Sequence, residues 1–337
     1  MKAVMVTAPG QVKVVDIPEP TPGPRDIVIR PRACGICGSD TFYISIGGIP
    51  PRQGKTILGH EAAGEVVEVG TEVEGFSVGD HVVVNPMGDP TGIIGNGGPT
   101  GALSELLLIR EAALGRSIAV IPNDLPFDIA ALNEPMAVAR HAVNRSNPRP
   151  GQKAVVFGAG PIGLGAAIGY KSLGAEHVVV VDVVPARLQR ALAVGADAII
   201  NSAKEDVKAR LFELHGAATS GTGHPRPGTD IYLDAAGVPA VIEMVLACTK
   251  HRATLCIPAV HKKPMSVDFG QILDTEIDIR MSMGYPTEIF EVTSDIVANR
   301  DKYGAIISHH FDFSDALEAL KLAATPGAAE KVVITFG

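Results

Sequence analysis

The first third of the chain carries short runs of valine and isoleucine that are separated by glycine, proline and aspartate. Examples are KVVDI (13–17), DIVIRP (26–31), AAGEVVEVG (62–70) and GDHVVVNP (79–86). Runs of this length, bounded by turn-forming residues, are typical of β-strands in a barrel or sandwich. The pattern therefore predicts a β-rich domain in this part of the chain.

The pattern changes at about residue 150, where apolar strands begin to alternate with helical periodicity. Helices are predicted at 161–174, 185–195 and 239–250. Six strands are predicted around them, namely KAVVFG (153–158), HVVVVD (177–182), DAIIN (197–201), DIYLDAAG (230–237), ATLCIPA (253–259) and IDIRMSM (277–283). This alternation is the pattern of a parallel sheet with crossover helices. Six strands make a complete dinucleotide-binding fold, so the sequence predicts an α/β protein.

Three further segments complete this outline. The tail from about 285, with a helix at 314–323 and a closing strand KVVITF (331–336), is too short for a domain and is expected to pack onto the first region. The segment 215–229 is rich in Gly, Pro, Ser and Thr and predicts a surface loop. The uncharged stretch 154–170 is short for a bilayer and dense in glycine, so it predicts a buried strand and helix rather than a membrane span.

Composition excludes several classes of function. The 29 Lys and Arg against 37 Asp and Glu give a formal charge of −8, which argues against nucleic acid or an anionic membrane as the main partner. Aromatic residues are 4% and Trp is absent, which argues against a stacking platform for bases. Four cysteines in 337 residues make no disulfide framework. The amino terminus lacks the pattern of a secretory signal, so a cytoplasmic protein that acts on a small molecule is expected.

A glycine-rich turn lies between the first strand and the first helix of the second region. VVFGAGPIGLGAA places Gly158, Gly160 and Gly163 in a G-x-G-x-x-G pattern. The first glycine permits the turn, the second lets the backbone approach a pyrophosphate, and the third lets the helix pack on the strand. The amino end of the helix then offers free N–H groups to the phosphates.

An acidic residue ends the next predicted strand. Asp182 follows Gly163 by 19 residues, close to the roughly 20 at which a carboxylate meets the ribose hydroxyls of NAD. Because this carboxylate would repel a 2′-phosphate, the sequence favours NAD over NADP. The alternative is that Asp182 only caps the following turn, which would leave the glycines unexplained. Arg187 is either a second ribose contact or a solvated surface charge.

Candidate metal ligands lie in the first region. His60 and Glu61 adjoin in LGHEAAGEVVEVG, and Cys37 lies in RACGICGSDTFY. A thiolate, an imidazole and a carboxylate form a mixed donor set that suits zinc. Glu134, in ALNEPMAVARHA, is a further candidate, although an acid in the first turn of a helix is also what the helix dipole favours.

Taken in order, these motifs resemble those of the zinc-dependent medium-chain dehydrogenase/reductases, the superfamily of the alcohol dehydrogenases. The motifs are CGICGSD, GHEAAGEVVEVG, GDHVVV, NEPMAVARHAV, GAGPIG and EKVVITF, and they span nearly the whole chain. The resemblance implies a GroES-like β-rich catalytic domain, 1–147 and 285–337, and a six-stranded parallel Rossmann domain, 148–284, that binds NAD. Glu134-Pro135, where alcohol dehydrogenases proper carry cysteine, resembles the branch of sorbitol, threonine, butanediol and sugar dehydrogenases. That branch implies transfer of hydride between a secondary alcohol and NAD.

The resemblance also implies roles for single residues. Cys37, His60 and Glu61 match the ligands of a catalytic zinc ion, and Glu134 matches a fourth ligand or an acid that exchanges with a zinc-bound water. Ser39 matches the hydroxyl that passes on the proton of the substrate alcohol. The positions that match cofactor contacts are Gly158, Gly160, Pro161, Ile162, Gly163, Asp182, Arg187 and Lys331, the last as a basic residue near the pyrophosphate.

Cys34 and Cys37 allow two other interpretations, which the sequence disfavours. A redox dithiol of the thioredoxin kind would lie at a helix start after a strand in a small α/β domain, and nothing near residue 34 has that pattern. A structural zinc clamp needs about four soft ligands, but Cys248 and Cys256 belong to the second region. Cys37 is therefore expected to be a ligand and Cys34 not.

The chain departs from the family pattern in three places. The segment 85–105 contains no cysteine, which predicts one zinc ion and no structural zinc. The histidine that often follows the ligand cysteine is missing, so Tyr43 or a water is expected to replace it. The segment 215–229 is longer than usual. Four histidines suggest a second metal site, but isolated histidines in loops are usually solvated; they are His215, His224, His309 and His310.

Two rival functions remain open at this point. One is a zinc-free NADP-linked reductase of enones or quinones, which would need no Cys/His/Glu set. The other is a nucleotide-binding relative without catalysis, which only the missing relay histidine favours. Members of the family are commonly dimers or tetramers, and the last predicted strand, 278–283, is a plausible edge for sheet extension, so a homodimer or homotetramer is expected.

Overall fold

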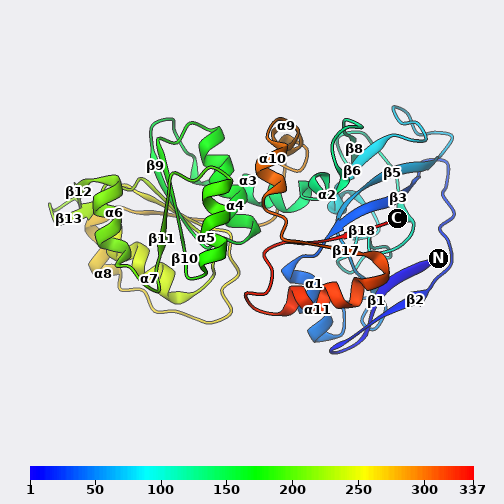
Figure 1. Cartoon of the computed structure of the whole chain (residues 1–337), viewed down its shortest axis with the longest axis horizontal. Coiled ribbons are helices and arrows are strands. Elements are labelled where there is room, and N and C mark those ends of the chain that lie inside the picture. The colour runs from blue at the N-terminus through cyan, green and yellow to red at the C-terminus, as the bar shows by residue number, and fades with distance from the viewer. The chain divides into compact units, whose positions relative to one another are not determined.

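The computed structural model describes all 337 residues, which form two compact units (Figure 1). One unit comprises Met1–Glu134 and Ile289–Gly337, and the other comprises Pro135–Glu288. The sequence predicts domain boundaries after residues 147 and 284, whereas the units divide after Glu134 and Glu288. The first boundary therefore lies later in the prediction than in the structure, by most of one helix.

That helix is α3 (Asn133–Ser146), which packs within the second unit. A Cβ on Gly165 would lie 2.6 Å from the sulfur of Met136, and the hydroxyl of Tyr170 donates a hydrogen bond to Ser146 at 2.9 Å. The helix therefore packs with its partners from the nucleotide-binding region, although its first residues come from the β-rich one.

The first unit is built from two β-sheets, as its short runs of valine and isoleucine predict. The larger sheet has seven strands in the order β17-β18-β3-β5-β6-β8, with β7 beside β3, and the smaller has the order β2-β1-β4. All pairs are antiparallel except β17 and β18. The strands are β1 (Lys2–Ala8), β2 (Gln11–Asp16), β3 (Ile27–Gly35), β4 (Thr56–Ile57), β5 (Glu61–Val69), β6 (His81–Val84), β7 (Leu107–Ile109), β8 (Ile118–Val120), β17 (His309–Asp312) and β18 (Val332–Thr335).

The carboxyl-terminal tail returns to this unit, as predicted. Its closing strand β18 pairs with β3, so that Val333 lies opposite Gly35. The apolar core of the unit accordingly combines side chains from the start and the end of the chain, for example Val4, Ile29 and Ile334. Its helices are α1 (Gly38–Ile46), α2 (Phe127–Ala130), α9 (Glu291–Ala298), α10 (Arg300–Gly304), α11 (Ala316–Ala324) and the 3₁₀ turns η1 (Pro86–Gly88) and η3 (Phe313–Asp315).

The second unit contains the predicted six-stranded parallel sheet, in the order β11-β10-β9-β14-β15-β16. The first three strands run outward from β9 to one edge of the sheet, and the next three run from β9 to the other edge, which is the strand order of a dinucleotide-binding fold. The strands are β9 (Lys153–Phe157), β10 (His177–Asp182), β11 (Ala198–Asn201), β14 (Ile231–Asp234), β15 (Thr254–Ile257) and β16 (Asp278–Met281). The helices are α4 (Pro161–Ser172), α5 (Pro185–Ala193), α6 (Val207–His215), α7 (Pro239–Cys248), α8 (Phe269–Ile272) and the 3₁₀ turn η2 (Leu273–Thr275).

The uncharged stretch 154–170 forms most of β9 and α4, as predicted. None of the helices has the length and apolar character that a bilayer crossing requires.

The segment 215–229 lies largely at the surface, as predicted, but the prediction that it is a loop is wrong. His215 ends α6, and β12 (Ala217–Thr219) and β13 (Pro225–Pro227) form a short antiparallel hairpin. His215 is buried and hydrogen-bonded to Thr229 at 2.7 Å, so the expectation of a solvated histidine is wrong there as well. The reason is local: the strands are only three residues long and two of their residues are prolines, so their composition is that of a loop.

Candidate functional site

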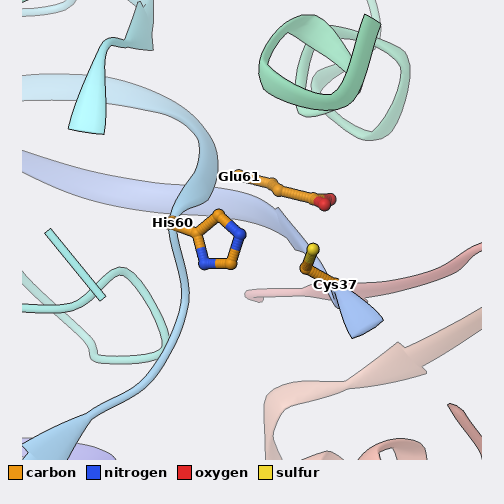
Figure 2. A group of neighbouring side chains, drawn as sticks. All are labelled: Cys37, His60 and Glu61. Atoms are coloured by element: carbon orange, nitrogen blue, oxygen red, sulfur yellow. The ribbon is translucent and has the colours of Figure 1, made fainter. Parts of the chain in front are cut away.

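Three of the predicted metal ligands lie together in the first unit. Cys37, His60 and Glu61 each offer one donor atom, and the three atoms lie within 4.8 Å of one another. Figure 2 shows the thiol, the imidazole and the carboxylate directed toward a common space. One sulfur, one nitrogen and one oxygen at this separation match a divalent ion of the zinc type.

Strand pairing explains why these distant residues meet. Glu61 begins β5 and lies opposite Gly35 near the end of β3, and Cys37 follows two residues later as the N-cap of α1. His60 is positioned by Gly59, whose φ of +93° favours glycine and where a Cβ would lie 2.5 Å from the backbone nitrogen of Leu103. The adjoining imidazole and carboxylate thus come from the start of one strand.

A buried lysine lies at the same site. The Lys331 ammonium bonds the Glu61 carboxylate and donates to the carbonyl of Ile36 at 3.0 Å, and the residue is only 2% exposed. Gly35 leaves the space for this pair, since a Cβ there would lie 2.9 Å from Lys331 Cε and still closer to Glu61. Lys331 is therefore a buried part of this site, and its partner here is an acid of the metal cluster.

The site has the electrostatics of a cation-binding site. Burial lowers the pKa of His60 and of Lys331, but neighbouring anionic groups outweigh burial and hold both pKa values above their usual range. Nδ1 of His60 and Oε1 of Glu61 are buried and have no hydrogen-bond partner within the chain. A cation bound to the cluster would satisfy Oε1 of Glu61, whereas Nδ1 of His60 faces the Asp40 carboxylate, so the residues present fit a zinc ion on the other ring nitrogen.

Glu134 lies close to this cluster without belonging to the group of three. It is buried in the first turn of α3, and its charge contributes to raising the pKa of both His60 and Lys331. Its position agrees with either predicted role, as a fourth ligand or as an exchanging acid.

Asp40 is a residue of the site that the sequence reasoning missed. Its side chain is fully buried, accepts the backbone N–H of Cys37 at 2.9 Å and approaches His60 Nδ1 to 3.6 Å. Burial raises the pKa of this carboxyl, and His60 and the Cys37 N–H oppose that rise. A carboxylate behind a ligand histidine fixes its ring orientation and tautomer. The spacing of Asp40, three residues after Cys37 in a helix start, was the signal available.

Ser39 and Tyr43 lie one turn apart on α1. Tyr43 is buried, and burial raises the pKa of its hydroxyl. The nearby Ser39 hydroxyl opposes this rise in the pKa of Tyr43, so the residue predicted to accept a proton lies near the residue predicted to replace the missing histidine.

Cys34 has the environment of a core thiol. It is fully buried and donates to the carbonyl of Gly35 at 3.5 Å. Burial holds the pKa of its thiol well above the usual value, so a thiolate at Cys34 is disfavoured. It does not belong to the cluster of three metal-binding side chains.

The second unit contains a cavity of about 840 Å³ at the carboxyl ends of its strands. Gly158, Gly160, Asp182 and Arg187, all predicted cofactor contacts, line it. The other walls come from the segments after β11 and β14 and from α7, including Ser202, Asp206, Ala235, Ala236, Val238 and Met244. This is the edge of a parallel sheet at which such folds bind their ligands.

The glycine-rich turn has the geometry that its pattern predicts. Gly158 has a φ of +97°, and a Cβ on Gly163 would overlap the carbonyl oxygen of Gly158. Pro161 and Ile162 form the first turn of α4 after Gly160. Asp182 accepts backbone N–H groups from Ala159, Val183 and Val184 at 2.7–2.8 Å, so it fixes the turn as well as facing the cavity.

Known protein families match parts of both units. Residues 23–118 match the alcohol dehydrogenase GroES-like domain, and residues 161–299 match the family described as zinc-binding dehydrogenase. The (R,R)-butanediol dehydrogenase of Bacillus subtilis is 32% identical over 307 residues, 85% of each chain. The sorbitol dehydrogenase of the same organism is 29% identical over 348 residues, 96% of this chain and 93% of that one.

A solved structure extends the likeness to the fold. A zinc-binding dehydrogenase from Sinorhizobium meliloti 1021 bound to NADP has a TM-score of 0.83 at 25% identity and covers 99% of this chain and 98% of its own. The chain is an oxidoreductase that belongs to the zinc-type medium-chain dehydrogenase/reductase family, in the branch of the butanediol, sorbitol and threonine dehydrogenases.

Proposed function

We propose that the protein is a zinc- and NAD-dependent dehydrogenase that oxidises a secondary alcohol of the polyol, sugar, diol or amino-alcohol class to the ketone. The observation that carries this proposal is the convergence of Cys37, His60 and Glu61 within 4.8 Å in a member of a zinc-binding dehydrogenase family. Relatives named butanediol and sorbitol dehydrogenase support the substrate class.

The proposed chemistry assigns a task to each group. Cys37, His60 and Glu61 would hold a zinc ion, which would supply a Lewis acid that lowers the pKa of an alcohol hydroxyl. Ser39, one turn from Tyr43 on α1, would accept the alcohol proton while its own hydroxyl proton moves outward to solvent through Tyr43 or a water. The nicotinamide supplies the hydride acceptor. The protein itself contributes orientation and a fixed set of charges.

The preference for NAD is proposed from Asp182. Its carboxylate lines the nucleotide cavity, where a 2′-phosphate would be repelled. One relative of the same fold binds NADP, so the preference needs a direct test. We expect kcat/KM for NAD to exceed that for NADP, and Asp182→Ala to reduce the ratio; equal values in the unaltered protein would contradict the assignment.

The metal assignment is tested by paired cysteine variants. Cys37→Ala should lose bound zinc and turnover while still binding NADH, because the cavity residues lie in the other unit. Cys34→Ala is the matched control and should keep its zinc. Metal content is read by elemental analysis and turnover by NADH absorbance with a panel of secondary alcohols. An unchanged rate in metal-free Cys37→Ala would overturn the proposal.

The same metal analysis separates the rival functions. About one zinc ion per chain is expected from a single ligand cluster, and the chain has no cysteine in 85–105 to form a second one. A chain purified without zinc that reduces enones with NADPH would instead be a zinc-free reductase. Zinc and NADH binding without turnover of any alcohol would favour the non-catalytic relative.

We also propose a homodimer or homotetramer formed at the edge of the parallel sheet. The edge strand β16 and the residues after it expose large apolar side chains, with Met281 62% and Met283 84% accessible. An unpaired edge with apolar side chains favours strand addition. Met281→Lys together with Met283→Lys should shift the mass measured by light scattering toward the monomer; an unchanged mass would exclude this edge.

A further inference from the structure

A histidine–carboxylate pair lies at the carboxyl end of β14 in the nucleotide-binding unit. Asp234, the last residue of β14, is fully buried, and its Oδ2 lies 2.7 Å from Nε2 of His261. His261 belongs to the segment between β15 and α8, and its neighbours Val260 and Lys262 are exposed. The histidine is thus the residue that turns inward from an otherwise exposed stretch.

Asp234 connects two segments of the chain through four hydrogen bonds. Its Oδ1 accepts the backbone N–H groups of Ala236 and Gly237, both at 2.9 Å. Its carbonyl accepts the N–H of Ala259 at 3.3 Å, and the fourth bond is that from His261. One side of this junction is the turn after β14, and the other is the segment after β15.

The turn held by Asp234 is a wall of the nucleotide cavity. Ala235, Ala236 and Val238 line the cavity. A Cβ on Gly158, the first glycine of the phosphate turn, would lie 3.0–3.1 Å from the backbone of Ala235 and Ala236. Gly237 is equally close to the other segment, since a Cβ there would lie 3.0 Å from the carbonyl oxygen of Val260. Movement of the segment after β15 would therefore reach the cavity wall through direct contacts.

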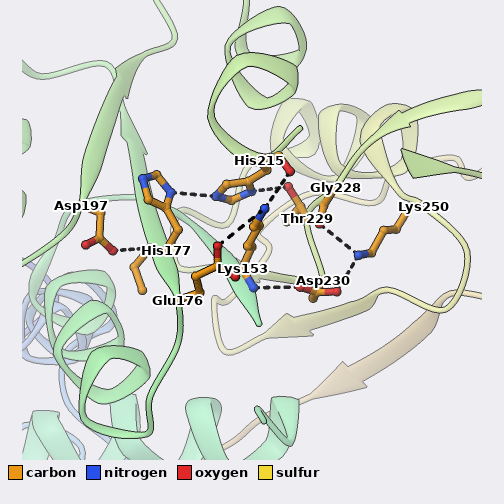
Figure 3. Close-up of polar contacts among 10 residues, drawn as sticks. Lys153, Glu176, His177, Asp197, His215, Gly228, Thr229, Asp230 and Lys250 are labelled. Carbon is orange, nitrogen blue, oxygen red and sulfur yellow. Dashed lines mark hydrogen bonds and ion pairs between the residues drawn. The ribbon is translucent and has the colours of Figure 1, made fainter. Parts of the chain in front are cut away.

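The opposite end of the same strand provides a comparison (Figure 3). There Asp230, just before β14, accepts the backbone N–H of Lys153 at 2.8 Å and pairs with Lys250 at 2.6 Å. Both ends of β14 are thus held by a carboxylate with one charged or titratable partner. Only the Asp234 end borders the cavity, because the cavity lies at the carboxyl ends of the strands.

We propose that His261 is a positioning residue for the nicotinamide cofactor: by bonding Asp234 it holds the cavity wall 235–238 and the segment after β15 in their binding arrangement. The proposal rests on the assignment of this cavity to the cofactor. His261 acts through Asp234 and the backbone of the turn.

The test compares cofactor affinity in variants at the two ends of β14. His261→Leu should raise the Kd for NADH by about fivefold or more, the value expected for the loss of one well-formed hydrogen bond. His261→Gln, which keeps a donor for Asp234, should stay within about twofold of the unaltered protein. Lys250→Met is the matched control and should lower the melting temperature without changing the Kd. The Kd is measured by NADH fluorescence on the full-length protein.

Several outcomes would overturn the inference. One is an unchanged Kd for NADH in His261→Leu. Another is an equal rise of that Kd in Lys250→Met, which would show that His261 contributes only to stability.

A second measurement needs no variant. NADH should slow hydrogen exchange at the amides of Gly237 and Ala259 more than at the amide of Lys153, and equal slowing would also contradict the inference. NADH binding requires neither zinc nor an alcohol, so failure of the proposed catalysis leaves this test intact. Repeating the titration with NADPH identifies a wrong cofactor assignment separately.

Discussion

At the scale of single residues, the proposed metal site has a buried carboxylate, Asp40, beside its three candidate ligands. Asp40 holds the Cys37 backbone N–H at 2.9 Å and faces His60 Nδ1 at 3.6 Å. With Nδ1 directed at Asp40, the other ring nitrogen is the one available to a metal. Asp40→Ala should therefore weaken zinc binding by about 10- to 100-fold, the usual cost of losing such a partner.

Competition with a chromogenic chelator measures this effect. Thr41→Ala on the same helix is the control, because its hydroxyl bonds only the carbonyl of Gly38. If Asp40→Ala bound zinc as tightly as the unaltered protein, the carboxylate would have no positioning role.

Lys331 compensates the buried Glu61 carboxylate when no metal is bound. Its ammonium is buried against Glu61, and removing one partner of a buried ion pair typically costs about 3–5 kcal/mol because a charge is left uncompensated. Metal-free Lys331→Met should lose stability of this order in urea unfolding. Zinc should restore much of it, because the ion then compensates Glu61.

Lys321→Met is the control, since that lysine is exposed on α11. A Lys331→Met protein that unfolds at the same urea concentration as the unaltered one without zinc would show that the pair contributes nothing.

At the scale of elements, the end of α6 carries a buried histidine, His215, that lies between Thr229 and His177 (Figure 3) and is expected to make the stability of the unit depend on pH. His215 bonds Thr229 through Nδ1 and His177 through Nε2 at 3.1 Å. Burial, followed by the nearby His177 and Lys153, lowers its pKa from 6.5 to about 4, while Asp230 opposes this and Lys250 adds to it.

A lowered histidine pKa means that the unfolded chain binds the proton more tightly. The stabilising contribution is therefore complete above about pH 6.5 and is lost as the pH falls toward 4, by at most about 1.4 kcal/mol per pH unit and about 3 kcal/mol in total. His215→Asn should flatten the dependence of urea unfolding on pH in this range, whereas the exposed His224→Asn should not. Parallel pH profiles for the unaltered protein and His215→Asn would contradict the prediction.

The elements also show what the sequence could predict. Strands such as β10 and helices such as α4 were predictable because their apolar periodicity is strong and local. Helix α1 was not predicted, since its aromatic and β-branched residues TFYISI favour a strand locally, and its start is set by Asp40 bonding the Cys37 N–H. The hairpin β12–β13 was missed because its strands are too short for any periodicity.

The candidate site also has a part that the sequence could predict and a part that it could not. The metal-ligand types of Cys37, His60 and Glu61 and the glycine spacing of the turn at Gly158 are local features, so the sequence could predict them. The pairs Lys331–Glu61 and His261–Asp234 were not predictable, because tertiary pairing brings together residues that are 270 and 27 positions apart. No periodicity encodes such contacts, and they are also the ones that determine the charge and order of each site.

At the scale of the whole molecule, the proposed zinc ion and the proposed nicotinamide cofactor are assigned to different units. The donors Cys37, His60 and Glu61 belong to Met1–Glu134, and the cavity residues belong to Pro135–Glu288. If the two sites share no binding residue, the free energy that couples them should be negligible. The Kd for NADH of the zinc-free protein should then stay within about twofold of that of the zinc-loaded protein. Turnover should nevertheless be abolished, since the proposed reaction needs both ligands.

The measurement is an NADH titration of chelator-treated and zinc-reconstituted protein, together with the alcohol rate of each. Reciprocity supplies an internal control: saturating NADH should shift the affinity for zinc by the same small factor. A Kd for NADH that rises by about tenfold or more on zinc removal would show that metal and cofactor binding are coupled by at least about 1.4 kcal/mol. The division into independent binding units would then fail, and the metal would have to organise the nucleotide-binding unit as well as its own.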